Sequence, residues 1–151
     1  TVGVSKGAKE FPGVDYAGPY SGTISAMMSH QFMVSSTLVH GEISVDTVKM
    51  FDHPEVAKVA QKVFVEVDEN VDSAFPHKTG ARLAVRLKNG ETISDFQEDL
   101  HPLNADEVIE RFRKYANGLI GGKRVDEIID KTLNIESLGS INDLMNLLEA
   151  D

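Results

Sequence analysis

The sequence contains no cysteine, which excludes a disulfide framework and a thiolate nucleophile. A cysteine-free chain suits a reducing compartment, and we expect a cytoplasmic protein. Basic residues are also few, since 15 Lys and Arg face 24 Asp and Glu and the net charge is −9. Nucleic acid needs clustered cations on its partner, whereas the cations here are dispersed among acids. We therefore expect no nucleic-acid partner.

Charge is missing altogether from the stretch between Tyr16 and Gly41, although 26% of the chain is charged. A membrane span needs about 20 mostly apolar residues. Seven polar side chains fall between Ser25 and Thr37, which argues against a span and against a membrane partner. The stretch instead predicts one buried helix over residues 23–40, ended by Gly41. Its small and polar side chains are typical of a helix that lines a cavity.

The remaining patterns divide the chain into three parts. Residues 1–22 hold five glycines and two prolines without periodicity, which predicts an extended arm. Residues 23–103 predict an α+β domain in which a small antiparallel sheet packs against helices. Residues 104–151 predict C-terminal helices, the first of them capped by Asn104 and Glu107.

Three segments give the strand signal. Val63, Val65 and Val67 alternate with other residues, and Leu83, Val85 and Leu87 do the same. Asn89-Gly90 then predicts a hairpin turn in which both residues have positive φ, and residues 91–96 return. Before the sheet, two short helices are predicted, one capped by Ser44 and one opened by Pro54.

Histidine is the residue type with the clearest chemical potential. None of the five histidines has the spacing of a zinc site, so we expect no metal. His30 differs from the others because it lies inside the uncharged helix. Such a histidine is more often a satisfied core residue, but a pKa near ~6.5 suits proton transfer if the ring faces a cavity. The residue patterns alone stop at an α+β domain of unknown function.

Five segments, taken in order, resemble the C-terminal half of the MmgE/PrpD family. They are PGVDYAGPYSG, AMMSHQFMVSSTLVHGEI, KVFVEVDENVDSAFP, ARLAVRLKNGETIS and HPLNADEVIERFRKYA. The family includes 2-methylcitrate dehydratases, cis-aconitate decarboxylases and iminodisuccinate epimerases. The resemblance, from about Phe11 to the end, implies a small lid-type α+β domain. It also implies that the C-terminal helices return towards a large helical domain that is absent from this chain.

The resemblance further implies a lyase or isomerase that abstracts a proton next to a carboxylate of a small di- or tricarboxylate. Such chemistry requires no organic cofactor, and most catalytic residues of the family lie outside the matched part. The tyrosine contributed by the small domain falls at Phe32, which has no proton to give, so the acid role would pass to a neighbour such as His30. The substrate-binding candidates are the turn and small polar residues Gly18, Pro19, Ser25 and Ser29.

Two hypotheses follow. In the first, the chain is the lid of an MmgE/PrpD-type enzyme and needs a helical domain, encoded upstream or on a separate chain. In the second, it is a non-catalytic domain that binds a partner protein through residues 23–40. A lone lid would expose an apolar face, predicted at Ile24, Met28, Phe32 and Val39. Soluble monomers rarely leave such a patch uncovered, so we expect a homo-oligomer, cover from the C-terminal helices, or disorder of that helix.

Overall fold

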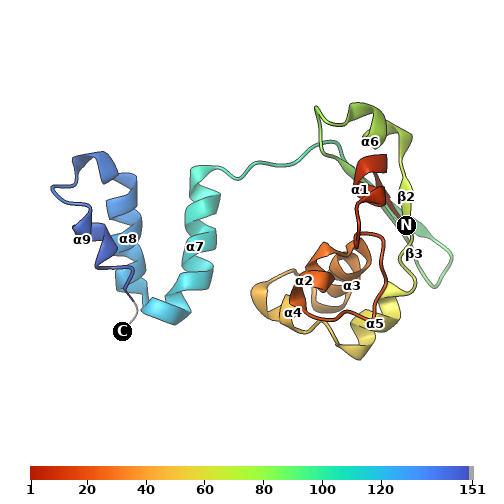
Figure 1. Ribbon diagram of the computed structural model, residues 1–151, viewed down its shortest axis with the longest axis horizontal. Coiled ribbons are helices and arrows are strands. Elements are labelled where there is room, and N and C mark those ends of the chain that lie inside the picture. Colours follow the sequence, from red (N-terminus) through yellow and green to blue (C-terminus); the bar gives the residue numbers. More distant parts are fainter. Residues whose placement is uncertain (150–151) are drawn as a thin grey trace. The chain divides into compact units, whose positions relative to one another are not determined.

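The computed structural model describes residues 1–149 and divides into two compact units (Figure 1). The first unit runs from Thr1 to Leu100, and the second begins at His101. The first unit combines a sheet with helices and the second is helical, so the predicted α+β class is confirmed. Within the described residues, no helix combines the length and the apolar content that a membrane span requires.

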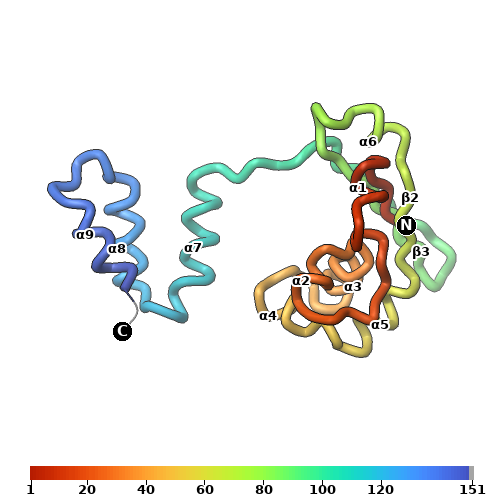
Figure 2. The backbone as a smooth tube through the Cα atoms, viewed as in Figure 1, coloured from red at the N-terminus to blue at the C-terminus, as the bar shows by residue number. Residues whose placement is uncertain are grey.

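The sheet of the first unit consists of β1 (Val2–Val4), β2 (Val65–Val67), β3 (Ala81–Arg86) and β4 (Thr92–Gln97). Its strand order is β2-β1-β3-β4. Strand β1 is parallel to β2 and antiparallel to β3, and β3 is antiparallel to β4. The sheet is therefore mixed rather than wholly antiparallel, because a strand that the sequence did not predict lies at its centre. Figure 2 shows this N-terminal segment running beside β2 and β3.

The expected arm over residues 1–22 thus needs correction at its start. Val2 and Val4 are buried on the sheet, and Ser5 caps the short helix α1 (Lys6–Glu10) by accepting a hydrogen bond from the Ala8 amide at 3.2 Å. A three-residue strand is too short to show a periodicity, and its stability comes from distant partners. The chain has no strand or helix from Phe11 to Gly22.

The helix predicted over residues 23–40 is two helices, α2 (Thr23–Met28) and α3 (His30–His40). Between them Ser29 has extended backbone angles, φ −83° and ψ 123°. Its hydroxyl accepts from the Phe32 amide at 3.0 Å, as an N-cap does. Serine competes with helical hydrogen bonds through its side chain, which is the physical reason for the break.

The break also removes the predicted apolar face. Ile24 is 79% exposed, whereas Phe32 is fully buried. Phe32 packs with buried Ala26, Val48 and Val56 in the main core of the first unit. The prediction of a single exposed stripe is therefore wrong, because residues on either side of Ser29 no longer share one helical surface.

The core around Phe32 is closed by two further helices, α4 (Val45–Lys49) and α5 (Pro54–Ala60), which Figure 1 shows grouped with α2 around α3. Ser44 caps α4 as predicted, accepting from the Thr47 amide at 3.2 Å. Gly41 ends α3 with φ 82°, again as predicted. Local capping chemistry was thus readable from the sequence on both sides of this core.

The sheet has one apolar and one charged face. Val2, Val4 and Val65 are buried against partly buried Ala8 and Val34, so α1 and α3 cover the apolar face. The other face carries an ion pair between the Asp68 carboxylate and Arg82 Nε at 2.6 Å. The Arg82 guanidinium also lies 4.4 Å from the centre of the Phe96 ring, and Asp68 caps the short helix α6 (Glu69–Ala74).

The β3–β4 hairpin forms at Asn89-Gly90, but its turn differs from the predicted one. Gly90 alone has positive φ, +89°, while Asn89 does not. The Gly90 amide donates to the Leu87 carbonyl at 3.0 Å, and the Leu87 amide donates to the Glu91 carbonyl at 2.7 Å. These bonds describe a three-residue loop with a left-handed glycine, the next most common hairpin connection after two-residue turns.

The second unit contains α7 (Ala105–Ile120), α8 (Gly122–Leu133), a 3₁₀ turn (Ile135–Ser137) and α9 (Asn142–Met145). The predicted capping pair is present, since Asn104 Oδ1 accepts from the Glu107 amide at 3.0 Å and Glu107 accepts from the Asn104 amide at 2.8 Å. Val125 and Ile128 are buried between the helices. Leu119 is 84% exposed, so part of the apolar surface of this unit has no cover within it.

Candidate functional site

The loop before α2 folds back over the break between α2 and α3. The His30 amide donates to the Val14 carbonyl at 3.0 Å, and the Ser29 hydroxyl donates to the Tyr16 carbonyl at 2.5 Å. Ser29 itself is fully buried. Its hydroxyl also accepts from the Phe32 amide and lies 3.4 Å from the Tyr20 hydroxyl and from Gln31 Oε1, so its contacts lie within the protein and its role in substrate binding stays a prediction.

A polar cluster built around buried Gln31 and the more exposed Asp15 and Lys9 fixes the same loop. Gln31 is 4% exposed, its amide nitrogen donates to Asp15 Oδ1 at 2.5 Å, and its oxygen accepts from the Tyr16 amide at 3.0 Å. Lys9 Nζ donates to Asp15 Oδ2 at 2.6 Å and to the Val65 carbonyl at 2.7 Å. The Lys9 ammonium holds the pKa of the Asp15 carboxyl below its usual value, despite partial burial. This cluster joins α1, the loop, α3 and β2.

Phe32, where the family resemblance leads us to expect a tyrosine, points into the core. Its ring contacts the Tyr20 ring edge to face, with the two centroids 5.2 Å apart. The Tyr20 hydroxyl lies 3.4 Å from Ser29 Oγ and 3.4 Å from the Tyr16 carbonyl. A phenol hydroxyl is therefore present beside the start of α3, although position 32 lacks one. Burial raises the pKa of the Tyr20 phenol, so the proton is held more tightly than usual.

His30 is partly buried, and its Nε2 atom is enclosed without a hydrogen-bond partner among the described residues. Burial lowers the pKa of the His30 imidazole, and the nearby Asp15 carboxylate offsets part of this effect. The neutral imidazole is favoured near neutral pH. The ring is therefore a poor proton donor near neutral pH, and its lowered pKa also makes it a weaker base than a free imidazole.

Gly18 and Pro19 line a pocket of about 520 Å³, together with Tyr20 and, from the opposite side, Lys58 and Gln61. Gln61 closes one edge by donating to the Ala17 carbonyl at 2.8 Å. Sequence reasoning missed Lys58 and Tyr20. Lys58 lies about 40 residues beyond the loop and carries no motif, while Tyr20 stands in the segment PGVDYAGPYSG but gives no sign of its contact with Phe32.

Ser25 lies apart from that pocket. Its hydroxyl donates to the Gly22 carbonyl at 2.8 Å and accepts from the Gly22 and Ser21 amides at 3.2 and 3.0 Å. These bonds cap the start of α2.

Of the six predicted site residues, the structure brings Gly18 and Pro19 to a pocket and leaves Ser25, Ser29 and Phe32 in structural positions. His30 belongs to neither group, since it does not line the pocket and its enclosed Nε2 atom has no hydrogen-bond partner among the described residues. In residues 1–149, no three His, Cys, Asp or Glu side chains gather as a metal site would require.

The position of His30 gives a pH prediction. Its pKa in the folded chain lies below the unfolded value of about 6.5, so the folded state binds fewer protons. The stability due to neutral His30 is complete above pH 6.5 and is lost as the pH falls through the lowered pKa. We expect urea unfolding to show a larger stability loss between pH 7.5 and 5.5 in the wild type than in His30→Gln. Exposed His77→Gln is the control, and equal losses in all three proteins would contradict the assignment.

Comparison with known proteins identifies the family to which the chain belongs. The family model of the MmgE/PrpD C-terminal domain matches residues 5–135. A cis-aconitate decarboxylase-like protein of Aspergillus oryzae is 25% identical over 130 residues, and human cis-aconitate decarboxylase is 25% identical over 131 residues. Each match covers 82% of this chain but 27% of the relative, so the chain spans about a quarter of the length of these relatives.

The matched range includes the loop, the α2–α3 break, strands β2, β3 and β4 and the α7–α8 helices described above, and it begins just after β1. It covers well over half of the chain. The protein therefore belongs to the MmgE/PrpD family and contains its C-terminal domain.

Proposed function

We propose that this chain is the lid-type small domain of an MmgE/PrpD lyase or isomerase acting on small di- or tricarboxylates. The observation that carries the proposal is the family match over residues 5–135. Proton abstraction next to a carboxylate would be followed by loss of water, loss of carbon dioxide or reprotonation. The principal acid and base would come from a helical part of the enzyme, on the same or a separate chain.

The side chains around position 32 support this division of labour. Phe32 has no ionisable group and lies in the core. The Tyr20 hydroxyl is hydrogen-bonded within the loop and its raised pKa makes it a poor acid. Partial burial of His30 favours its neutral form. None of these groups is prepared to transfer protons alone, so the domain would shape the cleft rather than supply its chemistry.

The charges around the pocket also suggest that this domain binds only part of the substrate and that the rest of the enzyme binds the remainder. Lys58 is the cation of the pocket that Gly18 and Pro19 line, and an ammonium group hydrogen-bonds strongly to a carboxylate. Asp52 lines the same pocket and would oppose a second carboxylate. A substrate with two or three carboxylates therefore needs further cations. In a chain with net charge −9, those cations would be provided by the rest of the enzyme.

The second unit offers a surface for the same partner. Helices α7 and α8 form an apolar groove of about 490 Å³, lined among others by Val108, Ile109, Phe112 and Ile128. Val108 is 51% exposed although it lies on the apolar side of α7. We propose that the helical part of the enzyme, or a second copy in a homo-oligomer, covers this groove.

The isolated chain should not catalyse the reaction. We expect no exchange of substrate C–H protons with deuterium when the chain is incubated in D₂O with cis-aconitate or 2-methylcitrate, because the prepared acid and base are missing. Proton NMR measures the loss of the substrate signals against a protein-free blank. Exchange above the blank that disappears in His30→Gln would show that this domain holds its own base and would contradict the proposal.

A non-catalytic role in protein binding is the second candidate. It is favoured by the exposed apolar side chains of α2, since Ile24, Met27 and Met28 are 79%, 53% and 39% exposed. The surface involved is narrower than the predicted helix over residues 23–40, because α3 buries Gln31, Phe32, Ser35 and Ser36. Turnover by the complete gene product would argue against this candidate.

A further inference from the structure

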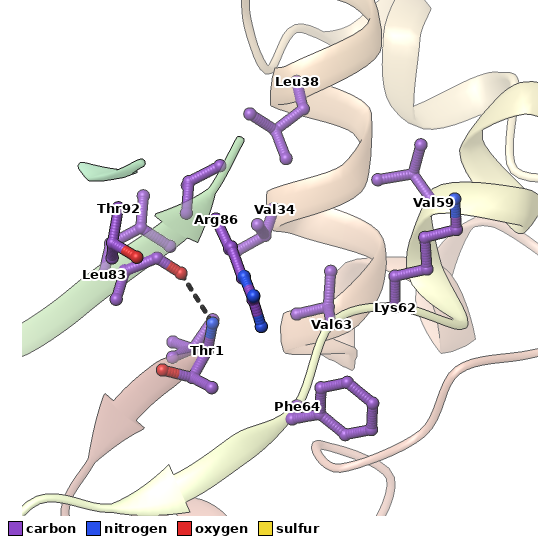
Figure 3. A pocket seen from close by; sticks show the side chains of 13 residues that line it. Thr1, Val34, Leu38, Val59, Lys62, Val63, Phe64, Leu83, Arg86 and Thr92 are labelled. Carbon is purple, nitrogen blue, oxygen red and sulfur yellow. Dashed lines mark hydrogen bonds between the residues drawn. The ribbon is translucent and has the colours of Figure 1, made fainter. Parts of the chain in front are cut away.

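A second hollow of the first unit lies on the apolar face of the sheet (Figure 3). Its volume is about 490 Å³, within the range of small-molecule sites. Val34 and Leu38 of α3 form one wall, Val63 before β2 another, and Leu83 and Val85 of β3 the floor. It shares no residue with the pocket at Gly18 and Pro19. The two pockets can therefore be tested separately.

Two cationic side chains border this hollow, besides the Thr1 ammonium, which donates to the Ala84 carbonyl at 2.6 Å. Arg86 and Lys62 both line it, and Figure 3 shows the Arg86 side chain pointing into it among apolar groups. Neither side chain forms an ion pair or hydrogen bond with any residue in 1–149. Arg82 on the same strand, by contrast, is paired with Asp68 and packed on Phe96. Arg86 is therefore available to an external anion.

The chemistry of the hollow selects one class of ligand. A guanidinium binds a carboxylate through two parallel hydrogen bonds, which an ammonium cannot do. The walls beyond it are mostly aliphatic, with Phe64 as one aromatic member, and gain from covering an alkyl chain. Away from these cations they offer no partner for a carboxylate, so a second carboxylate at the far end of a ligand would lie unpaired against apolar walls. The combination fits a molecule with one anionic head and one apolar tail.

We propose that this hollow binds an aliphatic monocarboxylate. The carboxylate lies on Arg86 with Lys62 nearby, and the alkyl chain lies along Val34, Leu38 and Leu83. The proposal does not depend on the lyase or isomerase function, because none of these residues belongs to the pocket at Gly18 and Pro19.

Calorimetric titration of the 151-residue chain with octanoate tests the proposal. We expect saturable binding of one octanoate per chain. Acetate, which has the head alone, and 1-octanol, which has the tail alone, should each bind at least tenfold more weakly. Arg86→Gln should weaken octanoate binding at least tenfold, whereas Lys88→Gln, an exposed cation of the same hairpin outside the hollow, should leave it unchanged.

Amide chemical shifts locate the ligand. The proposal predicts octanoate-dependent shifts at Val34, Leu38 and Leu83 in spectra of ¹⁵N-labelled protein. The ligand-free spectrum of Arg86→Gln should match that of the wild type away from residue 86, which shows that the variant is folded. Leu38→Ser provides a second variant, since Leu38 is 52% exposed and its loss should weaken the tail contact without unfolding the chain. The proposal is overturned if octanoate does not bind, or if Arg86→Gln binds octanoate as tightly as the wild type does. It is also overturned if the wild type binds 1-octanol as tightly as octanoate, or if the shifts are confined to the groove between α7 and α8.

Discussion

Phe32→Ala should lower the free energy of unfolding of the first unit by about 3–5 kcal/mol. Phe32 has no solvent-exposed surface. It packs with Val48 and Val56 and contacts the Tyr20 ring. Alanine would leave a cavity between α3 and the helices around it. Urea unfolding followed by circular dichroism measures the change. Leu38→Ala on the same helix is the control and should cost about 1 kcal/mol or less, because Leu38 is 52% exposed.

Phe32→Tyr sharpens this test because it introduces the tyrosine that the family resemblance implies at this position. A hydroxyl added to a fully enclosed ring needs a partner, and burying it without one costs about 1–3 kcal/mol. We therefore expect the tyrosine variant to be less stable than the wild type but more stable than Phe32→Ala. A Phe32→Ala protein that loses less than about 1 kcal/mol would mean that position 32 is not part of the core, and a cleft-lining role would then return.

Gly80→Ala should be the most damaging of the small substitutions. A Cβ atom at this position would lie 2.6 Å from the backbone oxygens of both Gln97 and Glu98. These oxygens cannot move independently, because Gln97 is paired with Ala81 at the end of the β3–β4 ladder. We expect a loss of about 1–3 kcal/mol, or more if the strands separate. Thermal unfolding measures it as a lower Tm.

Gly7→Ala is the matched control for that substitution. Gly7 lies in α1 and nothing stands within 4 Å of the position its Cβ would take. Alanine favours a helix over glycine by about 0.5–1 kcal/mol, so this variant should be as stable as the wild type or more so. If Gly80→Ala were equally harmless, the close packing of residue 80 against the end of β4 would be wrong.

The features predicted correctly from the sequence are those fixed by near neighbours. Ser44 as a cap, the Asn104–Glu107 pair and the hairpin at Asn89-Gly90 each involve residues within a few positions of one another. Their chemistry is local, so the sequence displays it. The finer geometry of the hairpin was missed because a two-residue and a three-residue loop can share the same Asn-Gly pair.

The features that were missed depend on distant partners. Strand β1 has only Val2, Gly3 and Val4, and it exists because β2 and β3 pair with it from more than 60 residues away. Ser29 breaks the uncharged helix as the N-cap of α3, and its hydroxyl also donates to the carbonyl of Tyr16 in the distant loop. A serine in an apolar stretch gives no sign of that contact.

The candidate site shows the same limit. Gly18 and Pro19 are turn residues among the predicted substrate-binding candidates, and the structure brings them to a pocket. Lys58 reaches that pocket from another helix, so no pattern around the loop could indicate it. Phe32 was placed by family resemblance at the position of a reactive tyrosine, but its burial became visible only with α4 and α5 in place.

Comparing the chain with the complete product of its gene in the deuterium-exchange assay tests the central claim most directly. The claim is that this MmgE/PrpD domain forms part of an enzyme whose acid and base lie elsewhere. It predicts exchange of substrate protons by the complete product, with cis-aconitate or 2-methylcitrate, and none by Thr1–Asp151 alone. Equal exchange by both proteins, or none with either substrate by the complete product even when any separately encoded helical part is added, would contradict it.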